Sequence, residues 1–275
     1  MKIKLLSLVL LASVVNFSCV QSKGDNSNGN DVMFSHLISD SGKGDVIEKS
    51  YDINFDELEI STSLNAEVFK SDKERIVVYA PSDLMKYVVV KQNGGKVQVK
   101  IQTDNLMKSI STDRIKIKVY AKDFDHLSAN SSGSIYLKDN FSFSDLDVKV
   151  SSSGTIKGNI NGGNINIQAS SSGNYEGEVT AKSLNMQSSS SGGIDIKGKS
   201  ESVNIQASSS GDVDAENFTT ESAVLATSSS ADITIGVSKS VTASASSSGD
   251  IRVIKRGSLN EITKNESSSG SISIQ

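Results

Sequence analysis

Apolar and polar residues alternate along most of the chain from about residue 45 to its end. Leu146 and Val148, for example, stand between Asp145, Asp147 and Lys149. A period of two is typical of β-strands that bury one face, because successive side chains point to opposite sides of a strand. No long segment shows the 3.6-residue period of a helix. The pattern therefore predicts an all-β protein.

A short serine-rich turn repeats through the second half of the chain. The tripeptide Ser-Ser-Gly, with Ala in place of Gly in one copy, recurs eight times at spacings of 18 to 21 residues. A repeat of about 19 to 20 residues indicates a solenoid, in which each repeat forms one coil. We expect a structural corner at the end of each copy: Gly133, Gly154, Gly173, Gly192, Gly211, Ala231, Gly249 and Gly270.

Both flanks of each corner carry apolar residues at alternate positions. Eight and six residues before the corner stand pairs such as Ile165 and Ile167, and two and four residues after it stand pairs such as Ile194 and Ile196. A strand therefore enters and a strand leaves every corner with its apolar side inward. We predict a single-chain β-solenoid, similar to a parallel β-helix, with two main sheets.

The serine two residues before each corner is present in all eight copies. We expect this serine to point inward where the two sheets converge, and its hydroxyl to stack along the axis in a hydrogen-bonded ladder. A nucleophilic or phosphate-binding role is the alternative. It is disfavoured because the chain has only two histidines, His36 and His126, and no Gly-Lys-Ser/Thr follows a glycine-rich loop.

The first half of the chain contains a degenerate copy of the same design. Phe55-Asp56-Glu57-Leu58 matches Phe124-Asp125-His126-Leu127, and four apolar residues then fall in the positions of Leu127, Ala129, Ile135 and Leu137, namely Leu58, Ile60, Ala66 and Val68. The segment Lys91 to Lys96, with Asn93-Gly94-Gly95 inside it, predicts a hairpin turn. We expect a body over 45–275, with irregular N-terminal coils at 45–124 and eight Ser-Ser-Gly coils at 125–275.

The N-terminus has the features of a secretory signal. Lys2 and Lys4 precede an apolar run from Leu5 to Val15, which is too short to remain as a membrane-spanning helix. Cys19 follows this run directly after a small residue, so we predict a lipoprotein signal peptide over 1–18 and acylation of Cys19. Simple cleavage with Cys19 as a bystander is the alternative. Residues 19–44, rich in Ser, Asn, Gly and Asp, predict a flexible tether.

Composition narrows the functional classes. A net charge of −4 without a long basic run argues against nucleic acid as a partner, and one cysteine excludes a disulfide within the chain. The chain has no Trp, its serine-rich half has few aromatic residues, and its basic residues are scattered along the sequence. These features disfavour a polysaccharide-active enzyme. No cofactor is expected.

Two features of the later coils leave alternatives open. Asp212, Asp232 and Asp250 directly follow three successive corners, so stacking would bring them together as candidate metal ligands, for example for Ca²⁺, or leave them as ordinary surface carboxylates. In the last coil, Lys264 and Glu266 occupy positions that are apolar elsewhere. They indicate either a polar cap on the terminal edge or a contact with a second subunit.

The sequence resembles the GIN-domain family of autotransporter adhesin heads, which are secreted or lipoprotein β-solenoids of Gram-negative bacteria. The resemblance covers roughly 46–270 and rests on Phe55-Asp56-Glu57-Leu58-Glu59-Ile60, on Asn93-Gly94-Gly95-Lys96-Val97 and on the eight corners. It implies cell adhesion and supplies no catalytic residues.

We therefore expect a non-catalytic lipoprotein of the cell envelope, anchored in the outer membrane and either periplasmic or surface exposed. Its expected partners are the membrane, through the lipid anchor, and a glycan or protein of a host or bacterial surface. A polysaccharide-active β-helix enzyme and a purely structural periplasmic scaffold are the alternatives, and an oligomer is compatible with the sequence.

Overall fold

The computed structural model describes residues 38–104 and 108–275, which belong to one compact unit. The described residues form 21 strands and a single 3-10 turn, η1 (Met85–Tyr87). Nineteen strands share one hydrogen-bonded sheet, and β1 (Ile38–Asp40) pairs separately with β8 (Lys108–Ile110). The prediction of an all-β solenoid with about 19 residues per coil is confirmed.

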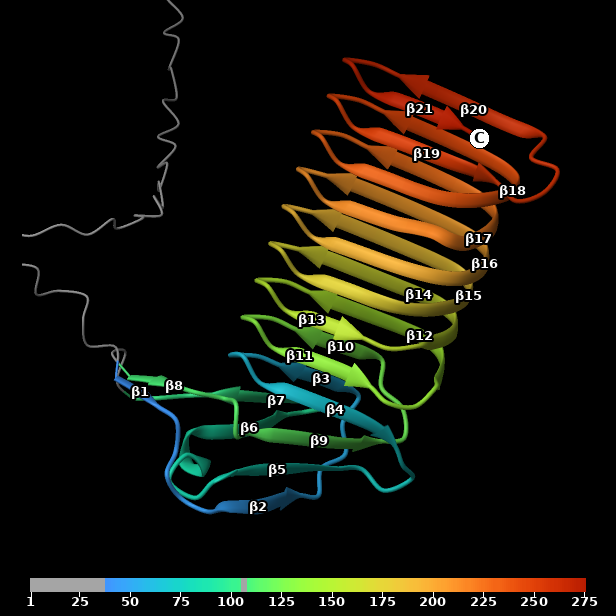
Figure 1. The fold of residues 1–275 in the computed structure, drawn as a ribbon. Helices are drawn as coiled ribbons and strands as arrows, with labels where there is room; N and C mark the ends of the chain where they lie inside the picture. The colour runs from blue at the N-terminus through green and yellow to red at the C-terminus, as the bar shows by residue number, and fades with distance from the viewer. Residues whose placement is uncertain (1–37, 105–107) are drawn as a thin grey trace, which may run out of the picture. The chain divides into compact units, whose positions relative to one another are not determined.

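The regular coils stack in parallel along one axis (Figure 1). Residues in neighbouring coils are therefore paired side by side about 19 positions apart, as in Ile165 with Leu184 and Leu184 with Val203. The strands of these coils are β10 (His126–Ala129), β11 (Ser134–Leu137), β12 (Phe141–Val150), β13 (Thr155–Lys157), β14 (Ile160–Ser170), β15 (Asn174–Ser189), β16 (Gly193–Ser208), β17 (Asp212–Thr227), β18 (Asp232–Ala245), β19 (Asp250–Lys255), β20 (Glu261–Glu266) and β21 (Ser271–Ile274).

Each coil folds the sheet into two layers. One layer leads into the Ser-Ser-Gly corner and the other leaves it, and β15 to β18 each run through both layers by way of a second, wider bend (Figure 1). The predicted inward residues fill the space between the layers: Ile165, Ile167, Ile194 and Ile196 are at most 2% exposed. The core is thus a column of stacked aliphatic side chains, with single aromatic residues such as Tyr175 inserted into it.

The corner serines do not point inward, which contradicts the sequence-based prediction. In the corner before Gly192, Ser190 and Ser191 are exposed and adopt left-handed φ values of 51° and 61°, and the Gly192 N–H donates to the Ser189 carbonyl at 2.9 Å. Two successive left-handed residues closed by this bond define a type I′ turn, and the other corners repeat the two positive φ values.

A main-chain ladder takes the place of the expected hydroxyl ladder at the corners. The Ser172 N–H donates to the Ser190 carbonyl at 3.2 Å, and Ser191 donates in the same way to Ser209 at 3.3 Å. The serine hydroxyls therefore remain at the surface, because the turn directs both central side chains outward.

The residue that ends each corner is small because neighbouring coils approach each other closely there. Gly192 does not have a positive φ, but a Cβ atom there would lie 2.5 Å from the Ala169 carbonyl oxygen of the preceding coil. Glycine is therefore required by the close approach of two backbones. Gly133, Gly154, Gly173, Gly211, Gly249 and Gly270 show similar close approaches, and Ala231 is fully buried in the equivalent position.

The degenerate copy in the first half is a regular coil. Strands β3 (Glu57–Ile60) and β4 (Asn65–Lys70) pair in parallel with β10 and β11. The register matches Leu58 with Leu127 and Ile60 with Ala129, which confirms the alignment made from sequence. Thr62 and Ser63, with φ values of 59° and 57°, form its corner, which lacks the Ser-Ser-Gly signature.

The rest of the N-terminal region differs from a stack of irregular coils. Strands β2 (Val46–Tyr51), β5 (Arg75–Pro81), β6 (Val88–Asn93), β7 (Lys96–Ile101) and β9 (Lys116–Ala121) form a cap that covers one end of the solenoid (Figure 1). Strands β7 and β9 continue the parallel layers, whereas β5 pairs antiparallel with both β2 and β9. The predicted hairpin is confirmed, since β6 and β7 pair antiparallel around Gly94.

At the other end, Lys264 and Glu266 bridge the two layers of the last coil. Lys264 Nζ donates to the Ile272 carbonyl at 2.8 Å, and the Ile272 N–H donates to Glu266 Oε1 at 2.6 Å. Both side chains thus satisfy main-chain groups at an edge, as expected for a polar cap.

Candidate functional site

A row of polar side chains, three of them asparagines, runs across five coils on the outer side of the layer that enters the corners. Asn204 Nδ2 donates to Asn185 Oδ1 at 3.0 Å, Asn185 Nδ2 donates to Asn166 Oδ1 at 2.9 Å, and Asn166 Nδ2 donates to Asp147 Oδ1 at 3.1 Å. His126 Nε2 lies 3.0 Å from Asp147 Oδ2 and ends the row. We call these five residues the amide row.

The two central asparagines of the amide row, Asn166 and Asn185, each keep half of their hydrogen-bonding capacity free. An Asn side chain has two N–H donors and an oxygen with two lone pairs. Within the row, Asn185 uses one N–H and one lone pair. One donor and one acceptor therefore remain for a ligand in each such coil, repeated at the coil spacing of about 4.8 Å.

A second polar row and a shallow groove flank the amide row. Gln168, Gln187 and Gln206 are stacked in register two residues further along the same strands. A cavity of about 540 Å³ lies at the N-terminal end of both rows and is lined by Gln168, Asn166 and Lys149 among others. Both rows are therefore accessible from one side of the solenoid.

Glu59 anchors the N-terminal end of this groove. Its Oε2 lies 2.6 Å from Lys96 Nζ, and its Oε1 accepts hydrogen bonds from Gln98 and Asn130 at 2.6 and 3.1 Å. Burial alone would raise the pKa of Glu59, but the bonds from Lys96, Gln98 and Asn130 hold this pKa below its ordinary value. Sequence reasoning missed this cluster because its members come from β3, β7 and the β10 corner.

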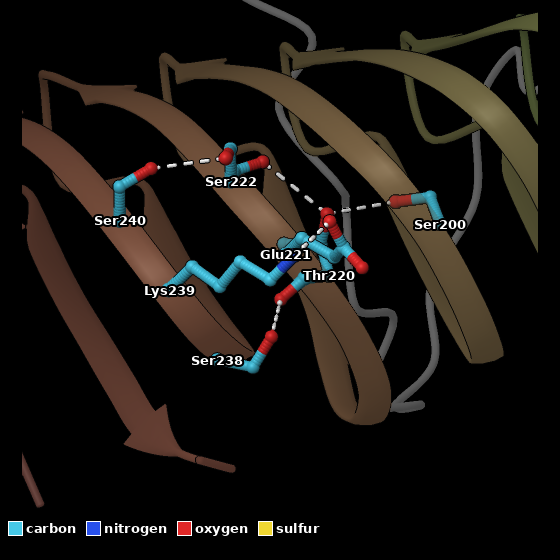
Figure 2. Close-up of polar contacts among 7 residues, drawn as sticks. All are labelled: Ser200, Thr220, Glu221, Ser222, Ser238, Lys239 and Ser240. Carbon is cyan, nitrogen blue, oxygen red and sulfur yellow. Dashed lines mark hydrogen bonds and ion pairs between the residues drawn. The ribbon is translucent and has the colours of Figure 1, made fainter. Parts of the chain in front are cut away.

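Hydroxyl groups gather at the second bend of the later coils, where Figure 2 shows a chain of contacts. Ser200 Oγ donates to Thr220 Oγ1 at 2.9 Å, Thr220 Oγ1 donates to the Ser222 carbonyl at 3.2 Å, and Ser240 Oγ donates to Ser222 Oγ at 2.9 Å. The nearby Lys239 ammonium is held by Glu221 at 2.7 Å. The hydroxyls are therefore bonded to one another, as in a structural network, and the lysine faces an acid rather than a serine.

The three candidate metal ligands stand in register but carry no metal-site geometry. Asp232 pairs with Asp250. Asp212 lies on the other neighbouring strand, directly before Val213, and Val213 pairs with Ile233, the residue that follows Asp232. Burial, together with the charges of Asp212 and Asp250, raises the pKa of Asp232. In the part of the chain that the structure describes, no three His, Cys, Asp or Glu side chains are grouped to hold a metal ion.

A second acidic row lies beside the first. Asp195 pairs with Glu176 on one side and Asp214 on the other. Burial and then the charges of Asp214 and Glu176 raise the pKa of Asp195, whereas Lys157 lowers it. Burial is thus the main cause of both raised pKa values, and repulsion between neighbouring carboxylates adds to it.

The predicted lipidation residue, Cys19, lies outside the described residues, as do 1–18 and most of the predicted tether. Over 38–104 and 108–275, the structure contains no helix that is long and apolar enough to cross a membrane.

Comparison with known proteins assigns the body to a described family. The family model "Putative auto-transporter adhesin, head GIN domain" matches residues 54–195 and 155–257. No curated protein matches the chain.

Solved structures share the fold at low sequence identity. A "putative adhesin" from Parabacteroides distasonis superimposes with a TM-score of 0.76 at 14% identity, over 86% of this chain and 100% of its own. A "putative adhesin" from Parabacteroides merdae gives 0.75 at 14% identity, over 86% and 99%. A "putative lipid binding protein" from P. distasonis gives 0.72 at 21% identity, over 86% and 99%.

Proposed function

The chain belongs to the GIN-domain family of auto-transporter adhesin heads, and from this premise we propose that it is a non-catalytic binding module of the cell surface. The family description supports an adhesin-like role. The amide row carries the proposal, because it presents a regular series of unused donors and acceptors along one layer.

The amide row suits a ligand that is rich in hydroxyl groups, such as a neutral glycan or a polar protein surface. Each free amide donor and acceptor contributes a modest hydrogen bond, because binding replaces bonds to water. Several coils acting together supply useful affinity without a deep pocket. The 540 Å³ groove, lined by His126, Asp147 and Asn166 of the row, adds a concave surface at its N-terminal end.

We further propose that acylation of Cys19 anchors the protein in the outer membrane and that residues 19–44 hold the body away from the lipid. Cleavage of a signal over 1–18 would expose Cys19 as the first residue. Adhesion requires the body to face outward from the cell, whereas a periplasmic scaffold does not.

Surface exposure is tested by antibody labelling of intact cells that express the full chain. We expect labelling that disappears after protease treatment of whole cells. Labelling that occurs only after the outer membrane is opened would overturn the adhesin role and favour a periplasmic scaffold.

The amide row is tested by replacing Asn166, Asn185 and Asn204 together with threonine. Threonine already occurs further along the same row, where Val224, Thr242 and Thr263 follow Asn204. The matched control is Asn174→Thr on the other layer, where Thr155 is already its neighbour. Cells that express the triple variant should lose binding to an array of neutral glycans and surface proteins. Equal loss in the control, or no loss in the triple variant, would contradict the assignment.

A further inference from the structure

Aromatic and basic side chains gather where β4 of the first coil meets β9 and β5 of the N-terminal cap, away from the amide row. The strands β4, β9 and β5 lie side by side there (Figure 1), with Phe69 paired with Tyr120 and Tyr120 with Arg75. Along β9 the outward residues are Lys116, Lys118 and Tyr120. These residues, together with Tyr79 on β5, are called the aromatic face.

The rings of the aromatic face form a platform rather than a buried cluster. Phe69 and Tyr120 stack with centroids 5.6 Å apart and planes 25° apart. Phe69, Tyr79 and Tyr120 are each only half-buried. Partly exposed aromatic rings offer an apolar surface on which a flat, weakly polar ligand can lie.

Three cations are placed over and between these rings. Arg75 Cζ lies 4.5 Å from the Tyr120 centroid, and Lys118 Nζ lies 6.0 Å from the Phe69 centroid and 5.8 Å from that of Tyr79. Lys116 stands opposite Tyr79. Since alternate residues of a strand are about 6.6 Å apart, the cations span about 13 Å along β9.

These cations differ from several others on the solenoid. Lys157, Lys197, Lys239 and Arg252 each form an ion pair with a glutamate. Within the described residues, neither Arg75, Lys116 nor Lys118 has an acidic group within ion-pair distance, and the buried Nε of Arg75 has no hydrogen-bond partner. A positive charge therefore stands uncompensated on a protein with a net charge of −4.

Two glutamates adjoin the aromatic face. Glu67 stands directly opposite Lys118 on the neighbouring strand, and its carboxylate is held by Lys138 at 3.2 Å. Glu48 pairs with Tyr79 across β2 and β5, and burial followed by a hydrogen bond to Glu48 raises the pKa of the Tyr79 phenol. Both carboxylates are thus engaged by neighbours and leave the three cations free for a ligand.

We propose that the aromatic face binds an anionic polysaccharide, with sugar rings lying on Phe69, Tyr79 and Tyr120 and carboxylates paired with Arg75, Lys116 and Lys118. Each ring has a cation over it or directly opposite it, as each sugar ring of a polyuronate carries a carboxylate. Arg75 is suited to this contact because a guanidinium can stack on a ring while its terminal N–H groups bind a carboxylate.

The test compares two polymers with the same backbone. The purified full chain is titrated with polygalacturonate and with its methyl-esterified form, which lacks the charges. We expect binding of polygalacturonate that weakens with salt, and little binding of the ester. Equal binding of both polymers, binding only to phosphatidylglycerol vesicles or to single-stranded DNA, or no binding would each overturn the proposal.

Variants locate the site. Lys118→Gln should weaken polygalacturonate binding about fivefold, as expected for one lost cation contact. Lys199→Gln, an exposed lysine on the coils, is the control and should leave binding unchanged. Circular dichroism verifies that both variants are folded, and equal effects of the two substitutions would contradict the assignment.

This site is independent of the proposed function of the amide row. The threonine triple variant should bind polygalacturonate normally, and Lys118→Gln should retain binding to neutral glycans. Loss of polygalacturonate binding in the triple variant would place the anion site on the coils instead of the cap.

Discussion

The corner glycines provide the sharpest test of how the coils pack. In Gly192→Ala, the new Cβ would lie 2.5 Å from the Ala169 carbonyl oxygen, 2.6 Å from its carbon and 2.9 Å from the Ser170 nitrogen. Carbon atoms in favourable contact are about 3.5–4.0 Å apart, so adjacent coils must separate locally by close to 1 Å. The obstructing atoms are all main chain, and no side-chain rotation can relieve the overlap.

Overpacking of this kind costs about 1–3 kcal/mol of the free energy of unfolding. Ala231 shows that one coil accommodates a methyl group at the equivalent position, which favours a cost within this range rather than complete unfolding. For a body of this size, each kcal/mol lowers the melting temperature by about 2–4 °C. We therefore expect Gly192→Ala to lower it by about 2–12 °C.

The neighbouring glycine supplies a matched control. In Gly193→Ala, the new Cβ would meet only the Asn174 side chain, with Oδ1 at 2.4 Å and Cγ at 3.5 Å. Asn174 is exposed and can change rotamer, so this variant should melt within about 2 °C of the parent or slightly above it. The measurement is thermal unfolding followed by circular dichroism. An unchanged melting temperature for Gly192→Ala, or an equal loss in both variants, would refute the close-approach explanation.

Four further outcomes are expected. The folded-state pKa of Glu59 is lowered, so this residue contributes stability that is present above the pKa of the unfolded chain and is lost as the pH falls through the folded-state value. In Glu59→Gln, the urea midpoint should therefore depend less on pH between about pH 5 and 3 than in the parent. An unchanged pH dependence would contradict this. Burial raises the pKa of Tyr175, so stability should decline above about pH 10, where the unfolded chain ionises, and Tyr175→Phe should remove that decline; a persistent decline would assign it to other groups. Thr220→Val removes the partner of the buried Ser200 hydroxyl and should cost about 1–3 kcal/mol in urea unfolding, and a parental midpoint would show that the bond contributes little. Cys19→Ser should move the protein from the detergent phase to the aqueous phase in Triton X-114 partitioning, and unchanged partitioning would remove the lipid anchor.

Much of the coil geometry could be read from the sequence because it is a local, repeated property. Alternation with period two determines which side chains of a strand face inward, and the corner spacing sets the coil length. Ile165, Ile167, Ile194 and Ile196 are buried as predicted. The match of Leu58 with Leu127 also held across an insertion of about fifty residues, since both strands must present the same side chains to one core.

The direction of the corner serines was predicted wrongly because the prediction rested on the size of the residues and not on backbone geometry. Small residues at a sharp turn are compatible both with an inward hydroxyl and with an outward one. The two successive left-handed residues decide between them, and sequence does not report φ for serine. For the same reason, the main-chain ladder that joins neighbouring corners could not be predicted from the sequence.

The candidate sites were partly predictable. The amide row follows directly from the repeat, because Asn166, Asn185 and Asn204 are 19 residues apart and must therefore stack. The aromatic face could not be found in this way. Phe69, Arg75 and Tyr120 come from strands that pair in both parallel and antiparallel directions, and the sequence argument considered only the absence of Trp and the few aromatic residues of the serine-rich half.

By itself, the sequence determined an all-β solenoid, its coil length, its inward residues and the eight corner positions, because each of these depends on contacts that recur with the repeat. Only the tertiary structure decided the outward direction of the corner serines, the cap formed by β2, β5, β6, β7 and β9, and the gathering of aromatic and basic residues beside it. Those features depend on left-handed backbone geometry and on non-repeating strand pairings, and neither leaves a periodic signal in the chain.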